Sequence, residues 1–162
     1  ATRTLVQTLH ASRPAGVETE VFAYGKLPLA FSARCFTARH YELNKDDCQF
    51  KCLDHAEGLT LKTREGQDFL CINGIQTMSA QHYNLLHEVP DLLAMGIDAL
   101  RLSPQQQHMA DIIAAFDAAR RGEAVAGDPA WASCGHVDGY WFGDAGIRQH
   151  HTAALNQLGV HA

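Results

Sequence analysis

Three of the five cysteines in this 162-residue chain lie in one polar stretch. They are Cys35, Cys48 and Cys52, in the segment "ARCFTARHYELNKDDCQFKC" at residues 33–52. Thiolates at the spacing C-x12-C-x3-C can converge on one soft metal ion or an iron–sulfur cluster, because a loop of this length brings distant ligands together. The spacing lacks the C-x2-C pairs of common zinc sites. A Cys3His zinc site and ordinary free cysteines therefore stay open beside a cluster.

A tetrahedral site needs a fourth ligand besides the three thiolates. Within the chain the candidates are His40, His55 and Cys134, and a cysteine in sequence outside the chain is a further one. Cys71 lies in the apolar run "FLCIN", which is typical of a buried strand, so we expect it to be a small core residue. For Cys134, which lies among turn residues, we favour packing over ligation.

Arginines near the cysteines suggest binding of an acidic group. Arg34 and Arg39 flank Cys35, where each could clamp a carboxylate bidentately or compensate thiolate charge. Arg101, at the end of a predicted strand, is a third candidate for substrate binding. Other catalytic patterns are weak. "HEVPD" lacks the second His of a zinc-protease helix, and there is no G-x-S-x-G elbow or Walker loop, so the catalytic residues stay unassigned.

The composition indicates one domain, residues 1–162, with a well-buried core, because 46% of the residues are hydrophobic and 19% are charged. A net charge of -5 with scattered Lys and Arg gives no footprint for nucleic acid. No apolar run is long enough for a membrane span, and the first residues do not have the order of a signal peptide. An odd number of cysteines argues against a disulfide framework, so we expect the reducing cytoplasm.

Predicted strands and helices alternate along the chain. The strands are residues 17–24, 68–73 and 97–102, and the helices are residues 2–10, 79–88, 90–96 and 104–122. A long cysteine-bearing loop spans residues 25–67, with a possible hairpin turn at residues 64–66, and a tail rich in Gly and aromatic residues spans residues 127–162.

This alternation predicts an α/β fold with parallel strands, arranged as a partial (β/α) barrel. About three units are too few to close an eight-fold barrel, so we expect the carboxyl-terminal half of a barrel-type protein. The carboxyl ends of parallel strands share one face, where loops carry function. The cysteine loop should lie over that face, and six residues should lie on its rim: Asn73, Gly74, Gln76, Thr77, Ser103 and Gln105.

Four segments carry a resemblance to a known family. They are "YGKLPLAFSARCFTARHYELNKDDCQFKC", "LCINGIQTMSAQHYNLL", "LRLSPQ" and "GYWFGDAG". Together they resemble the ubiquinone-biosynthesis members of the collagenase-like peptidase family, from about residue 17 to residue 146. The resemblance implies a barrel-type fold and a [4Fe-4S] cluster. It assigns three cluster ligands to Cys35, Cys48 and Cys52, and the fourth to an amino-terminal half outside this chain.

The same resemblance implies a function and a partner. It implies a heterodimer with a UbiU-like paralogue and an oxygen-independent hydroxylation of a ubiquinone precursor, with prephenate as the hydroxyl donor. Peptidase activity is not expected, because no triad or metalloprotease motif accompanies the resemblance. The competing hypothesis is a zinc-stabilised or metal-free α/β binding module that serves as a scaffold without catalysis of its own.

Overall fold

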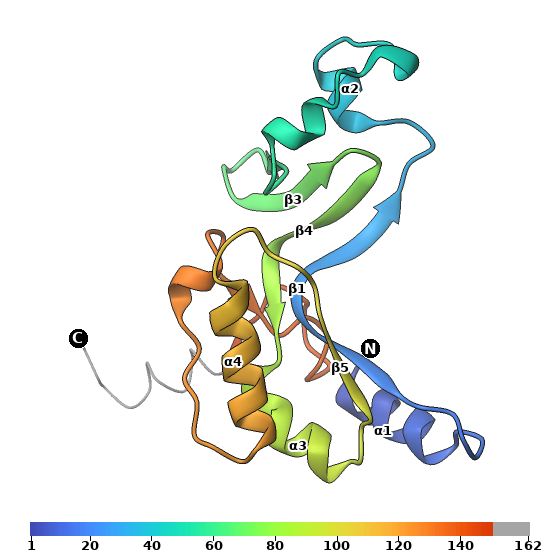
Figure 1. Ribbon diagram of the computed structural model, residues 1–162, viewed down its shortest axis with the longest axis vertical. Coiled ribbons are helices and arrows are strands. Elements are labelled where there is room, and N and C mark those ends of the chain that lie inside the picture. Colours follow the sequence, from blue (N-terminus) through green and yellow to red (C-terminus); the bar gives the residue numbers. More distant parts are fainter. Residues whose placement is uncertain (151–162) are drawn as a thin grey trace.

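The structure is a computed structural model that describes residues 1–150 (Figure 1). Its strands are β1 (Glu20–Phe31), β2 (Leu59–Lys62), β3 (Asp68–Asn73), β4 (Gln76–Asn84), β5 (Ala99–Leu102) and β6 (His136–Val137). Its α-helices are α1 (Arg3–Ala11), α2 (Phe36–His40), α3 (Val89–Ala94) and α4 (Met109–Arg120). Short 3-10 helices are η1 (Lys45–Asp47), η2 (Lys51–Asp54), η3 (Leu86–Glu88) and η4 (Pro129–Trp131).

One mixed sheet organises the described residues. The strand order is β2-β3-β4-β1-β5, and β6 also pairs with β4. β1 pairs in parallel with β5, and β4 pairs in parallel with β6, whereas the β1–β4, β3–β4 and β2–β3 pairs are antiparallel. The sheet does not close on itself. The predicted α/β class with a partial barrel-like sheet is therefore confirmed, with fewer parallel pairs than the alternation of elements had indicated.

The long ribbon of β1 and β4 joins two lobes (Figure 1). The thiol lobe, residues 27–79, contains the far halves of both strands, the cysteine segment with α2, and the hairpin of β2 and β3. The core lobe contains α1, α3, α4, β5, β6 and the near halves of β1 and β4.

The hydrophobic core lies in the core lobe. α4 buries Ile112, Phe116 and Ala119, while the neighbouring Ile113 is half exposed. Trp141 from the aromatic tail is 1% exposed and donates its Nε1–H to Glu88 Oε2 at 3.0 Å. Part of the predicted tail therefore belongs to the core, and its residues 151–162 lie outside the described residues.

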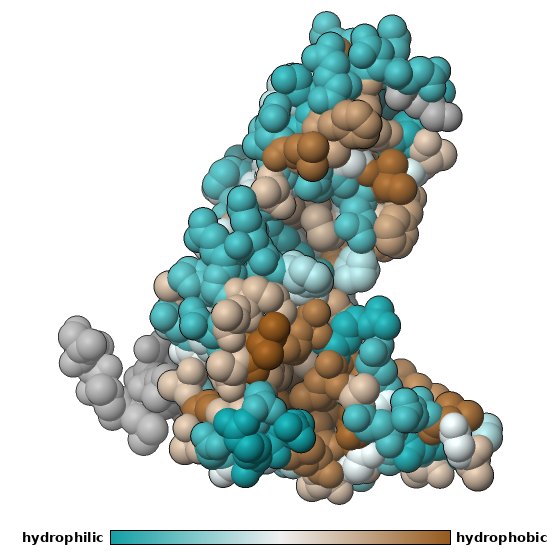
Figure 2. All heavy atoms as spheres, in the orientation of Figure 1, coloured by the Kyte–Doolittle hydropathy of each residue, from teal (hydrophilic) through white to brown (hydrophobic). Residues whose placement is uncertain are grey.

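The thiol lobe buries little by comparison. Among its described side chains, the fully buried ones are Thr37, Ala38 and Cys71. Several large apolar side chains on this lobe are more than half exposed, and Figure 2 shows brown patches there. They are Leu29, Phe31, Phe50, Leu53 and Phe69. The lobe is therefore held by strand pairing and local hydrogen bonds more than by apolar burial.

Two expectations about elements were wrong. Residues 79–88 do not form a helix, because residues 76–84 are strand β4 and hydrogen-bond to β1 on one side and to β3 and β6 on the other. The loop predicted for residues 25–67 is shorter, since β1 continues to Phe31 and β2 begins at Leu59. The hairpin predicted to turn at residues 64–66 is confirmed as β2–β3.

The helices of the described chain also bear on whether it could span a membrane. None of the helices in residues 1–150 is long and apolar enough to cross a membrane.

Candidate functional site

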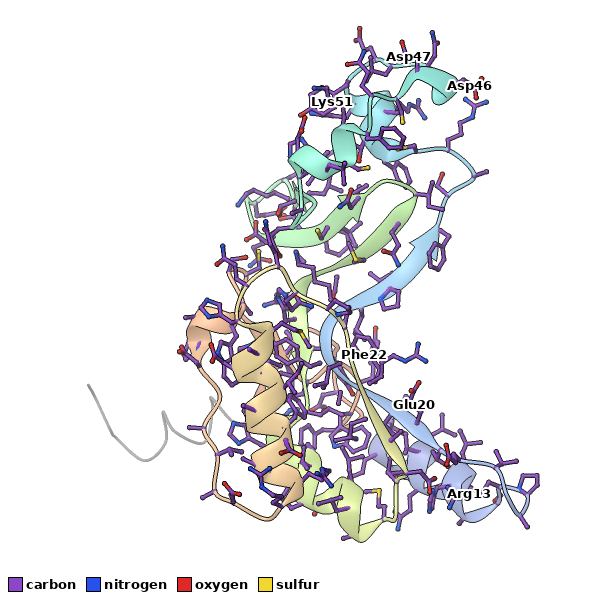
Figure 3. All side chains as sticks on the ribbon, in the orientation of Figure 1. Arg13, Glu20, Phe22, Asp46, Asp47 and Lys51 are labelled. Carbon is purple, nitrogen blue, oxygen red and sulfur yellow. The ribbon has the colours of Figure 1, made fainter. Side chains whose placement is uncertain are left out.

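The three clustered cysteines lie in the part of the thiol lobe that is farthest from the core lobe. Cys35 is the N-cap of α2, where its Sγ accepts the backbone N–H of Ala38 at 3.4 Å. Cys48 ends η1, and Cys52 lies within η2, which packs against α2. All three are free and half-buried. Figure 3 labels Asp46, Asp47 and Lys51, which mark this end of the lobe.

A sharp chain reversal separates Cys48 from Cys52. Gln49 and Phe50 both adopt left-handed backbone conformations, with φ of 51° and 50°. Two such residues in succession are unfavourable for L-amino acids, and strain of this kind gathers at ligand sites. Phe50 is also 71% exposed, so no apolar burial compensates the strain.

The three cysteines are chemically suited to bind a metal ion or an iron–sulfur cluster, but their side chains are not gathered around one point. Sulfur ligands favour iron–sulfur clusters and zinc, and an N–H···S hydrogen bond like that at Cys35 tunes such sites. Within residues 1–150, no group of three or more His, Cys, Asp or Glu side chains is placed to hold a metal ion. The chemistry of the three cysteines therefore fits an iron–sulfur cluster or zinc, although their side chains are not pre-assembled around such a group.

The candidate fourth ligands inside the chain have other partners. His55 Nε2 lies 2.5 Å from the Tyr41 hydroxyl, and the two rings stack at 5.8 Å. His40 packs its ring edge-on against the same Tyr41 at 5.0 Å. Cys134 follows Ser133 on the other lobe and interacts with Asp68, and burial raises the pKa of its thiol. The described residues thus assign no fourth ligand.

Cys71 is buried in β3, as predicted, at 1% exposure. Its Sγ–H donates to the carbonyl oxygen of Glu57 at 2.9 Å, and its Sγ lies 3.5 Å from Lys26 Nζ. These contacts make Cys71 part of a polar cluster where β1, β3 and the segment before β2 meet.

The structure brings together two of the three predicted arginines. Arg34 and Arg39 line a cavity of about 620 Å³ beside Cys35, and neither forms an ion pair with another described residue. Arg101 lies elsewhere. It stands opposite Phe22 in the β1–β5 pair and binds Glu20 at 2.6 Å. Figure 3 labels Phe22 and Glu20, which lie on the core lobe.

Four of the six residues predicted for the functional rim converge, whereas Gly74 and Thr77 do not line the same pocket. Asn73, Gln76, Ser103 and Gln105 line one pocket of about 260 Å³ at the junction of the two lobes, beyond the carboxyl end of β5. Sequence reasoning missed Lys26, which lines the same pocket. Lys26 was missed because the predicted strand ends before Gly25, whereas β1 continues through that glycine and places Lys26 in the same pocket as Gln76.

His82, beneath this pocket, was also missed. It is opposite Lys26 in the β1–β4 register, and its Nε2 lies 2.7 Å from Gln105 Oε1. Gln105 Nε2 donates to the carbonyl oxygen of Ser103 at 2.9 Å, which fixes Oε1 as an acceptor and therefore places the imidazole proton on His82 Nε2. Burial lowers the pKa of His82, so the ring is neutral at pH 7.

Fold and site together define a mixed α/β protein with an open barrel-like sheet and a separate lobe that carries three thiols. The family model for peptidase family U32 matches residues 3–124, about three quarters of the chain. The chain belongs to this family, which is the collagenase-like peptidase family that the sequence resembles. No solved structure matches the chain.

Proposed function

We propose that the chain is the thiol-bearing part of a UbiV-like iron–sulfur subunit. In this proposal Cys35, Cys48 and Cys52 hold a [4Fe-4S] cluster whose fourth ligand comes from outside the chain. The observation that carries the proposal is the presence of three free, half-buried thiols in one lobe of a U32 family member. The strained reversal between Cys48 and Cys52 supports it, because a bound group would offset the cost of that conformation.

The proposed reaction is the oxygen-independent hydroxylation of a ubiquinone precursor in the cytoplasm, with a UbiU-like paralogue as partner and prephenate as hydroxyl donor. When bound, the cluster would supply electron transfer or an open iron site. Arg34 and Arg39 are the chain's own candidates for holding an acidic substrate beside it, since both line the cavity next to Cys35. Arg101 has a weaker case, because its guanidinium is already paired with Glu20.

Metal analysis tests this proposal. The chain is purified without oxygen or reconstituted with iron and sulfide, and its iron, acid-labile sulfide and visible absorption are measured. We expect iron and sulfide in cluster stoichiometry. Cys48→Ser should remove the absorption, because it deletes one ligand. Cys71→Ser is the matched control and should keep it, since Cys71 is bound to Glu57 and Lys26 in a different part of the lobe.

Two results would reject the cluster. A colourless protein with stoichiometric zinc and no sulfide would support the zinc-stabilised scaffold instead. Zinc and cluster must be compared in this way because no ligand set is gathered in residues 1–150. Equal loss of absorption in both serine variants would show that the assignment of Cys48 over Cys71 is wrong.

A further inference from the structure

The pocket at the junction of the lobes has its own lining, although Ala56, Asn73 and Gln76 also line the neighbouring cavity that contains Cys52. One face of the sheet supplies Lys26, Gln76 and Met78, and residues 56–57 and 103–106 form its walls. Its lining includes none of the three proposed cluster ligands. The volume of about 260 Å³ is just below the roughly 300 Å³ at which pockets for drug-sized ligands begin, so it suits a small metabolite.

Gly25 allows the pocket wall formed by residues 103–106 to approach the sheet. Gly25 has a φ of 122°, and a Cβ there would lie 2.5 Å from Ser103 Cβ. Ser103 N–H donates to the carbonyl oxygen of Tyr24 at 2.8 Å, which fixes the start of the wall at residues 103–106. Lys26, directly after this glycine, is thereby covered, and its side chain is only 10% exposed.

Lys26 is the only cation among the described residues of the lining, and its charge is weakly compensated. Its Nζ donates to the carbonyl oxygen of Glu57 at 2.7 Å and lies 3.5 Å from Cys71 Sγ. The Glu57 carboxylate is 46% exposed. Its Oε2 lies 3.5 Å from Lys26 Nζ, which is longer than a charge-assisted hydrogen bond. An incoming anion can therefore replace this carboxylate at Nζ while Glu57 turns toward water.

The rest of the lining offers neutral hydrogen-bonding groups and apolar contact. The side chains of Gln76 and Gln106 make no hydrogen bond to another described residue. Asn73 donates its Nδ2–H to the carbonyl oxygen of His55, and its buried Oδ1 has no partner among the described residues. Ala56, Met78 and Pro104 are the apolar residues of the lining. Buried polar atoms without partners commonly mark a place for a ligand or water.

We propose that this pocket binds a small carboxylic acid with an apolar body. The carboxylate lies on Lys26 Nζ, the amides of Gln76 and Gln106 donate to its oxygens, and the apolar body packs against Met78 and Pro104. A single Lys with neutral amides matches the single charge of a carboxylate. Phosphate, with its higher charge, is generally held by Arg clusters or by several backbone N–H groups, which this lining does not supply.

The test compares two ligands of nearly equal shape and different charge. Benzoate and benzamide are titrated into the full chain, and binding is followed by NMR shifts of backbone amides. We expect benzoate to shift amides at residues 25–27, 76–78 and 103–106, and to bind about tenfold or more tightly than benzamide. Inorganic phosphate is titrated as well and should bind more weakly than benzoate.

Two variants move the affinity in opposite directions. Lys26→Met should weaken benzoate binding by about tenfold or more, because it removes the cation. Glu57→Gln should tighten it by roughly three- to fivefold, since it removes the competing carboxylate and keeps Lys26 in place. Lys62→Met is the control and should change nothing, because Lys62 forms an exposed ion pair with Asp68 outside the pocket.

The proposal is overturned if benzamide or phosphate binds as well as benzoate, or if Glu57→Gln weakens benzoate binding. Unchanged affinity in Lys26→Met would also overturn it. The site does not depend on the proposed cluster. Benzoate should bind Cys48→Ser as it binds the unaltered chain, so failure of the cluster and failure of the pocket give different results.

Discussion

Buried and half-buried side chains that can titrate meet in the core lobe. The Tyr24 ring lies 5.9 Å from the rings of both His82 and His136, measured between centroids. The Tyr24 hydroxyl also lies 3.3 Å from His136 Nε2. Burial raises the pKa of Tyr24 to about 12 and, with His82 and His87 nearby, lowers the pKa of His136 to about 4. All three rings are therefore uncharged at neutral pH.

This cluster predicts a loss of stability in acid. Unfolding restores His136 to a pKa near 6.5, so between pH 6.5 and pH 4 the unfolded chain binds a proton that the folded chain does not. The free energy of unfolding should fall as the pH is lowered through this window, by up to about 3 kcal/mol from this residue. Urea unfolding at several pH values measures the fall.

His136→Asn provides the comparison, because it removes the titrating ring. Its free energy of unfolding should change less between pH 6.5 and pH 4 than that of the unaltered chain. Parallel pH profiles for the two proteins would contradict the assignment to His136.

Single residues differ in how far the sequence predicts their roles. Cys71 was correctly predicted to be buried, because a small residue inside an apolar run has few alternatives. Lys26 and His82 were missed, because their importance comes from facing each other across β1 and β4. A cross-strand pair depends on strand register, which no local pattern around either residue displays.

The close approach of β1 to the end of β5 depends on one glycine. Gly25→Ala should lower the free energy of unfolding by about 2 to 4 kcal/mol, because it adds backbone strain and a clash with Ser103. Gly66→Ala is the matched control. Gly66 also has a positive φ, of 86°, but no atom lies within 4 Å of the added Cβ, so we expect a loss of only about 1 kcal/mol. Equal losses in urea unfolding would contradict the clash.

One element was predicted with the wrong type, although the sequence contains a signal for it. The sequence pattern predicts a helix at residues 79–88, but residues 76–84 are β4. Gly74 is that signal, because glycine is favoured at the first of the two central positions of a tight hairpin, and Gly74 turns the chain from β3 into β4 with a φ of 57°. The pairing of β4 with strands on both sides then outweighs any helical preference, because helix signals are local and sheet pairing is not.

The two lobes differ in what holds them together. The core lobe contains the buried cluster around Tyr24 and Ile112, whereas residues 32–58 of the thiol lobe bury only Thr37 and Ala38 among their described side chains. Hydrogen exchange should therefore be at least about 100-fold faster for amides in residues 32–58 than for those of α4. Mass spectrometry of exchange resolves the two segments, and equal protection would contradict the difference in packing.

A bound cluster should change this pattern in a specific place. Ligands that bind the folded chain stabilise it, so reconstitution with iron and sulfide should slow exchange in residues 32–58 and leave α4 unchanged. Slower exchange in both segments would indicate a general effect on folding.

The open sheet has a further consequence at its β5 end. β5 is an outer strand among the described residues, and strands with unpaired edges can recruit other chains and aggregate. This strand is only four residues long and bears the exposed Arg101 with its partner Glu20 from β1. Short length and surface charge both discourage edge-to-edge pairing. The exposed charges of Arg101 and Glu20 at this edge therefore disfavour its pairing with another chain.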